Sequence, residues 1–152
     1  MGLENASQHY LLQLQHGDYV AIGACIVTTG KNAMWKRTFG TSVTAMSTFS
    51  IGTGTATPAV TDTALQTGLV GWATGGLTYK TFLAGYPTYD TVNRIVTWRG
   101  QVTSTEANGN TITEIGEFNT DGSPIMLSRS VFTGIAKNSS TQIIFEIKHT
   151  IS

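Results

Sequence analysis

Two charged residues in the C-terminal half stand where the sequence pattern predicts apolar ones. In the stretch 112–118 (ITEIGEF), alternation places Glu114 on the apolar face of a predicted strand, and in 125–131 (IMLSRSV) it does the same for Arg129. A turn predicted at 119–122 makes the two strands neighbours. An unpaired buried charge is very costly, and a hydrogen-bonded ion pair is the usual solution. The sequence therefore predicts a partly buried cross-strand ion pair between Glu114 and Arg129; the alternative is that both side chains line a binding groove.

The stretch 50–65 (SIGTGTATPAVTDTAL) has the close glycines and hydroxyl groups of a loop that could hold a phosphate. A dinucleotide-binding fingerprint needs a third glycine three residues after Gly54, but Thr57 occupies that position. A phosphate loop ends in Gly-Lys-Ser or Gly-Lys-Thr, and no lysine lies between Lys31 and Lys80. Because the residues that would do the chemistry are missing, we expect a strand end followed by a turn that Asp62 opens.

Other catalytic or metal-binding patterns have little support in the sequence. The three histidines, His9, His16 and His149, have no acidic or cysteine neighbours at ligand spacing. No serine stands in a Gly-x-Ser-x-Gly elbow. Alternation places Glu114 and Glu117 on opposite faces of one strand, which argues against a glycosidase pair. We therefore predict no catalytic, cofactor-binding or metal-binding residue, and expect that the protein is not an enzyme.

Charge and cysteine content limit the possible partners further. Charged residues make up 12% of the chain, about half the usual share. Nine basic and nine acidic residues cancel, so nothing points to nucleic acid or a membrane surface. The low charge density fits a protein packed against neighbours, or equally a β protein whose polar faces carry Thr, Ser and Asn. The single cysteine, Cys25, is expected to be a small buried residue rather than a reactive thiol. The sequence has no signal-peptide pattern and no apolar run long enough for a membrane span.

The elements that must position these residues are predicted to be strands. The composition is rich in Thr and Gly, and period-two alternation is clearest in the C-terminal half. There we predict a meander of four antiparallel strands joined by short turns, at 92–105, 111–118, 125–133 and 143–151. In the N-terminal half the candidates are a strand or a short helix at 10–14, strands at 19–28 and 43–51, a short helical turn at 61–66 and a broken strand at 69–79. The prediction is one all-β domain over 1–152, an antiparallel β-sandwich or flattened barrel.

Two segments are candidate interfaces. Residues 1–15 could form an N-terminal arm, or 10–14 could be an ordinary first strand; the apolar anchors would be Tyr10, Leu11, Leu12 and Leu14. The loop 83–89 holds Tyr86 and Tyr89, and such loops often carry binding residues.

Three motifs, taken in order, resemble a known group of proteins. The stretch 51–65 (IGTGTATPAVTDTAL), followed by 112–119 (ITEIGEFN) and 126–129 (MLSR), is similar to small tailed-bacteriophage virion structural proteins over about residues 48–152. The hairpin also resembles the attachment domains of phage tail-fibre proteins. Glu117 departs from the pattern, because an apolar residue is usual there.

This resemblance implies a virion component without enzymatic activity or cofactor. The expected function is an accessory protein that decorates or cements the capsid as a symmetric homo-oligomer, first of all a homotrimer. Its partners would be the major capsid protein or neck and tail proteins, with no nucleic acid and no membrane. It would be located in the virion, and in the host cytoplasm during assembly. The alternatives are a neck, collar or tail-fibre attachment protein, and a receptor- or glycan-binding module.

Overall fold

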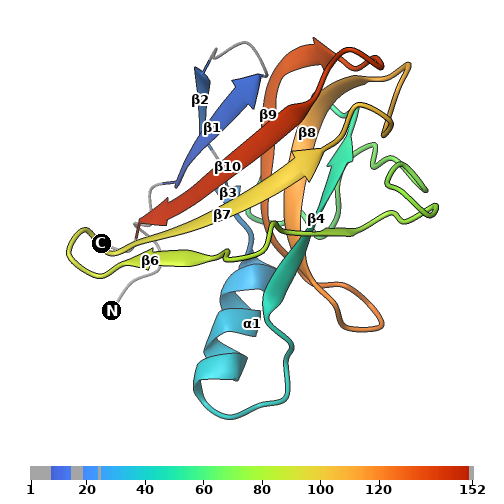
Figure 1. Cartoon of the computed structure of the whole chain (residues 1–152). Helices are drawn as coiled ribbons and strands as arrows, with labels where there is room; N and C mark the ends of the chain where they lie inside the picture. The colour runs from blue at the N-terminus through green and yellow to red at the C-terminus, as the bar shows by residue number, and fades with distance from the viewer. Residues whose placement is uncertain (1–7, 15–18, 24, 151–152) are drawn as a thin grey trace.

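The chain folds into two antiparallel five-stranded sheets packed face to face (Figure 1). This computed structural model describes residues 8–14, 19–23 and 25–150, with the backbone alone up to residue 23. The first sheet has the order β2-β1-β10-β7-β6, comprising β1 (Gln8–Leu14), β2 (Tyr19–Gly23), β6 (Thr88–Asp90), β7 (Ile95–Val102) and β10 (Ile143–Thr150). The second has the order β3-β9-β8-β4-β5, comprising β3 (Cys25–Ile26), β4 (Met46–Gly52), β5 (Lys80–Thr81), β8 (Thr111–Asn119) and β9 (Met126–Ala136). The predicted all-β sandwich is confirmed.

The core lies between the sheets and follows the predicted alternation. Every second residue of β10, from Ile143 to His149, is buried and faces the second sheet. Phe49 on β4 reaches across to Phe145 on β10, with ring centroids 6.3 Å apart. Gly100 on β7 makes room for Phe49, because a Cβ at position 100 would lie 2.6 Å from that ring. Burying such a side chain contributes about 2 kcal/mol to folding.

The predicted C-terminal meander is wrong except for its β8–β9 hairpin. Strand β7 pairs with β10 along its whole length, while β8 pairs with β9 and β4. The connections 103–110 and 137–142 therefore cross between the sheets. Residues 108–109 are Asn-Gly, which favours a turn. That local preference is the same whether the flanking strands pair with each other or lie in different sheets. Apolar faces on all four strands are better buried when the strands are divided between two facing sheets.

Buried charges stabilise the end of the sandwich where these two connections cross between the sheets. Glu106 accepts hydrogen bonds from Lys80 Nζ at 2.6 Å and from the backbone N–H of Thr103 at 2.8 Å. Lys137 Nζ donates to Ser104 O, at 3.3 Å, and to Asn108 Oδ1, at 2.7 Å. The contact between Lys80 and Glu106 joins β5 to the connection 103–110. The contacts of Lys137 join the connections 137–142 and 103–110 to each other.

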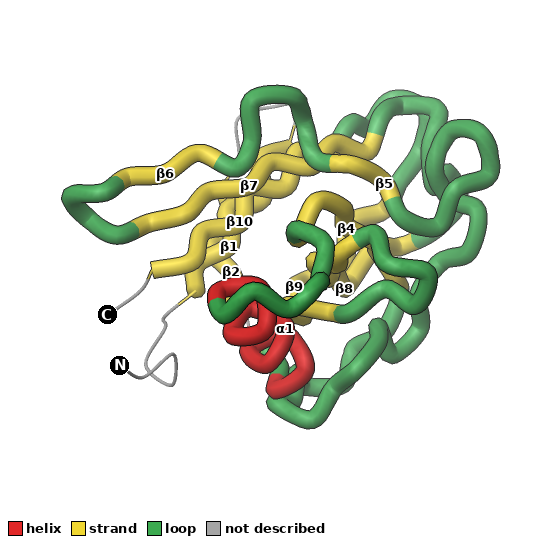
Figure 2. Tube along the Cα trace, turned by 90° about the horizontal axis from the view of Figure 1, so that it is seen from below, coloured by secondary structure: helices red, strands yellow, loops and turns green. Residues whose placement is uncertain are grey.

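A helix, α1 (Thr28–Thr38), lies at one end of the sandwich, where no helix was predicted (Figures 1 and 2). It has no side-chain N-cap and no acidic residue in its first turn. Its buried residues are Gly30 and Ala33, and a Cβ at Gly30 would lie 2.5 Å from Leu127 O on β9. The helix thus owes its stability to close packing on β9 more than to its own sequence. The single strand predicted at 19–28 is wrong: the stretch holds β2 and β3, which belong to different sheets, and the second of them ends at Ile26 before the helix.

The N-terminal stretch 8–14 forms β1, between β2 and β10. Tyr10, Leu11, Leu12 and Leu14 therefore belong to an ordinary strand by their backbone, which corrects the arm hypothesis for this stretch. Their side chains lie outside what is described, as do residues 1–7 and 15.

Candidate functional site

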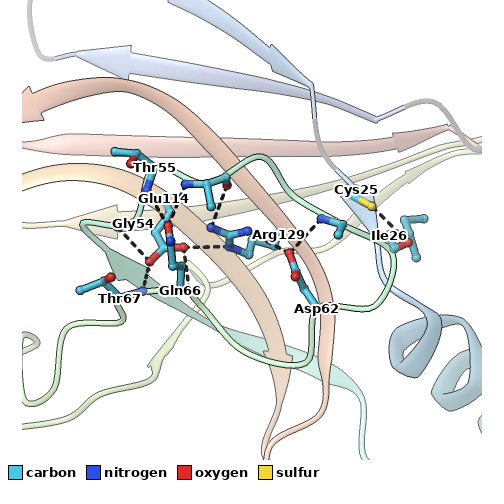
Figure 3. Close-up of polar contacts among 11 residues, drawn as sticks. Cys25, Ile26, Gly54, Thr55, Asp62, Gln66, Thr67, Glu114 and Arg129 are labelled. Carbon is cyan, nitrogen blue, oxygen red and sulfur yellow. Dashed lines mark hydrogen bonds and ion pairs between the residues drawn. The ribbon is translucent and has the colours of Figure 1, made fainter.

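The ion pair predicted from alternation is present on the β8–β9 hairpin. Arg129 Nε donates to Glu114 Oε2 at 2.8 Å (Figure 3). The Glu114 side chain is fully buried and that of Arg129 is 2% exposed, so the pair is buried more deeply than expected. This burial also corrects the alternative in which the two side chains line an open groove.

The Glu114 carboxylate binds the backbone of the segment 53–67, which covers it. Its Oε1 accepts the N–H of Gly54 at 3.1 Å and of Thr67 at 2.7 Å, and its Oε2 accepts the N–H of Gln66 at 3.0 Å (Figure 3). Both ends of the segment are thereby fastened to one side chain of β8. Hydrogen bonds of this kind, to an ionised acceptor, are about twice as strong as neutral ones.

The close glycines make this approach possible. A Cβ at Gly54 would lie 2.6 Å from Glu114 Oε1 and 2.7 Å from Gln66 Cβ. At Gly52 the same carboxylate would also be overlapped. The glycine-rich stretch therefore does surround an anion with backbone N–H groups, but that anion is the protein's own carboxylate.

Arg129 extends the network to the middle of the segment. Its Nη1 donates to Asp62 Oδ2 at 2.9 Å and its Nη2 to Ala56 O at 3.1 Å. Burial by itself lowers the pKa of Arg129, but the bonds and charges of Glu114 and Asp62 outweigh it and raise that pKa. Burial likewise raises the pKa of Asp62, and the N–H of Ala59 together with Arg129 brings it below its usual value. Arg129 and Asp62 are therefore both charged at neutral pH.

Gln66, within the segment, and Thr113, outside it, bind further polar groups of the segment. Gln66 Oε1 accepts the N–H of Thr55 at 2.8 Å and of Ala56 at 2.7 Å. Thr113 Oγ1, on β8, donates to Gly54 O at 2.8 Å. The carboxylate accepts four hydrogen bonds and each guanidinium nitrogen has a partner, so the arrangement suits fastening rather than proton transfer. Asp62 was expected only to open a turn, and its bond to Arg129 has no signal in local spacing.

A second buried carboxylate joins the two sheets. Glu117 Oε2 lies 2.6 Å from His149 Nε2 on β10 and accepts the hydroxyl of Ser128 at 2.5 Å. His149 also packs edge-on against Trp98, with ring centroids 4.8 Å apart. The contact between Glu117 and His149 was not predicted from the sequence, because their strands are distant in the chain and lie in different sheets. No group of three or more metal-binding side chains occurs in the described part of the chain.

The other candidate residues take less specialised positions. Tyr86 is half-buried, with the Arg99 guanidinium 5.4 Å from its ring centroid, which is a structural contact. Tyr89 on β6 is 71% exposed and remains available to a partner. Cys25 is partly buried; burial and, to a lesser extent, the charge of Asp62 raise its pKa, which disfavours a reactive thiolate.

Comparisons with protein-family models, with curated proteins and with solved structures found no match to this chain. Within the described residues, no helix is both long and apolar enough to cross a membrane.

Proposed function

We propose that the protein is an accessory structural protein of a tailed-phage virion, which decorates or cements the capsid. The observation that carries the proposal is that the motifs behind the resemblance meet in one buried network. The stretch 51–65 contributes Gly54 and Asp62, the stretch 112–119 contributes Glu114, and the stretch 126–129 contributes Arg129. Motifs that are distant in the sequence thus have one shared physical task, which gives their order and spacing a reason.

The distribution of charge supports a role in contact rather than in catalysis. Ion pairs within the described part of the chain take up Lys80, Arg99, Arg129 and Lys148. The large apolar side chains that remain exposed include Val70 and Val92. A surface with few free charges and scattered apolar anchors can be buried against a neighbour at a small desolvation cost.

The proposed mechanism is mechanical. A symmetric homo-oligomer, first of all a trimer, would bury surface across the boundaries between capsid subunits. Many weak contacts repeated by symmetry give a large avidity without one tight site. The buried network would keep the segment 53–67 in place while the particle is under load.

The experiment that tests this proposal is a cryo-EM reconstruction of the particle with the chain located in it. Copies on the order of hundreds, on the outer shell, would support decoration. A few to tens of copies at the portal or tail would support the neck or tail-fibre attachment alternative instead. Absence from the particle, together with binding of the isolated protein to a glycan array, would favour the receptor- or glycan-binding module.

A further inference from the structure

Helix α1 exposes two stacked aromatic rings. Trp35 and Phe39, at the end of the helix, lie with ring centroids 5.3 Å apart and planes 5° from parallel. Trp35 is 40% exposed and Phe39 is 73% exposed. The helix stands at one end of the sandwich (Figures 1 and 2). Exposed apolar surface concentrated in this way is typical of a contact site.

Unpaired positive charge flanks the rings. Lys31 lies one turn before Trp35 on the helix, and Lys36 follows it directly. Neither lysine has a carboxylate partner among the described residues. From residue 19 to residue 61 the sequence contains no Asp or Glu, although the whole chain is neutral. The helix is therefore a local positive region, whereas most other charged side chains in the described part of the chain are in ion pairs.

A groove runs along the side of the helix next to the rings. It lies between α1 and residues 124–126 and has a volume of about 280 Å³. Asn32 and Lys36 line it from the helix, while Pro124 and Ile125 form an apolar wall. The Asn32 side chain makes no hydrogen bond within the described part of the chain, so its amide is available to a ligand backbone.

We propose that this face of α1 and the adjoining groove bind an extended segment of a partner protein that carries both acidic and apolar side chains. Carboxylates of the segment would pair with Lys31 and Lys36, its apolar side chains would pack on Pro124, Ile125 and the aromatic rings, and Asn32 would bond its backbone. Charge complementarity and the apolar wall decide the class of partner. The local cations are few compared with the six to ten phosphate contacts, roughly, of a typical nucleic-acid binder.

The test uses the whole protein and a fluorescent peptide in which Glu alternates with Leu. Binding is measured by anisotropy, and the contacted residues are mapped by amide NMR shifts. We expect shifts confined to α1 and 124–126, and an affinity about tenfold weaker in Lys36→Glu, since two unit charges change at a partly screened contact. Arg94→Glu is the matched control, because Arg94 is also exposed and has the same charge change, and its affinity should equal that of the wild type. Trp35→Ser should weaken binding without changing the net charge.

Three results would overturn the proposal. The first is equal binding of a peptide with Gln in place of Glu, which would remove the role of charge. The second is a set of NMR shifts that lies away from α1. The third is tighter binding of an oligothymidylate, which would assign the face to nucleic acid. The measurement needs no virion, so its outcome is independent of the proposed location in a phage particle.

Discussion

Replacing Glu114 with Gln should destabilise the protein strongly, although the two side chains have nearly the same shape. The carboxylate accepts four hydrogen bonds, three from backbone N–H groups of the segment 53–67 and one from Arg129. A Gln side chain offers a single oxygen, and its amide N–H₂ would face donors at the other position.

The expected cost follows from these contacts. At least two charge-assisted hydrogen bonds are lost, at about 1.5–3 kcal/mol each. Arg129 keeps Asp62 as a counter-ion, which limits the penalty of an unpaired buried charge. The free energy of unfolding of Glu114→Gln should therefore fall by about 3–6 kcal/mol.

Two measurements test this prediction. Urea unfolding gives the change in free energy, and amide hydrogen exchange reports on Gly54, Gln66 and Thr67, whose N–H groups should lose protection. The matched control is Glu146→Gln, which removes the carboxylate from ion pairs with Arg99 and Lys148, whose side chains are 42% and 33% exposed. That variant should cost about 1 kcal/mol or less.

The reasoning is refuted if both variants lose the same small amount of stability. It is also refuted if the three amides keep their protection in Glu114→Gln, since the segment would then be fastened by something other than the carboxylate.

Three further predictions follow from the same contacts. Gly54→Ala should lower the free energy of unfolding by about 1–3 kcal/mol, because its Cβ would overlap the buried carboxylate. Gly122 has open space around it, so Gly122→Ala should change that free energy by no more than about 0.5 kcal/mol in the same urea assay. Equal costs for the two variants would contradict this prediction. Burial raises the pKa of Glu106, but hydrogen bonds from a lysine, two backbone N–H groups and a threonine hydroxyl outweigh it and lower that pKa to about 2 from 4.5. The stability that Glu106 contributes is therefore present above about pH 5 and lost towards pH 2. Over that range the free energy of unfolding, measured in urea, should fall by about 3 kcal/mol more in the wild type than in Glu106→Gln. Equal losses in the two proteins would refute this prediction. His149→Ala should cost about 3–5 kcal/mol, because it leaves the buried Glu117 carboxyl group with only a hydroxyl as a partner. Glu117→Leu combined with His149→Phe should be neutral or stabilising by thermal unfolding, and a double variant as unstable as the single one would count against this account.

The strands of the fold were largely readable from the sequence, but their pairing was not. Alternation locates β8, β9 and β10 to within a few residues, because it records which face of each strand is buried. It does not record which strand lies alongside, and β7 and β10 pair across about 40 intervening residues of chain. Helix α1 was missed because its sequence lacks helix signals and its stability comes from packing on β9.

The same division applies to the candidate site. The pair Glu114–Arg129 was predictable because a local turn joins its two strands and both charges interrupt an apolar pattern. The contact of Arg129 with Asp62 and that of Glu117 with His149 depend on how distant segments come together. A single sequence holds no periodic signal for such contacts. The glycines at 52 and 54 did signal an anion, but only the fold identifies it as a side chain of the same molecule.

The fastening of the segment 53–67 has a consequence for variation and design. The bonds to Glu114 are made by main-chain N–H groups, and Arg129 also binds a main-chain oxygen, at Ala56. Between these anchors, side chains such as Thr55 and Val60 are exposed and take no part in the attachment. The exposed side chains of this segment can therefore be replaced, by natural selection or by grafting an epitope, while the glycines, Asp62 and Gln66 keep its backbone in place. The groups that attach the segment to the fold are thus different from the side chains that the segment exposes to solvent.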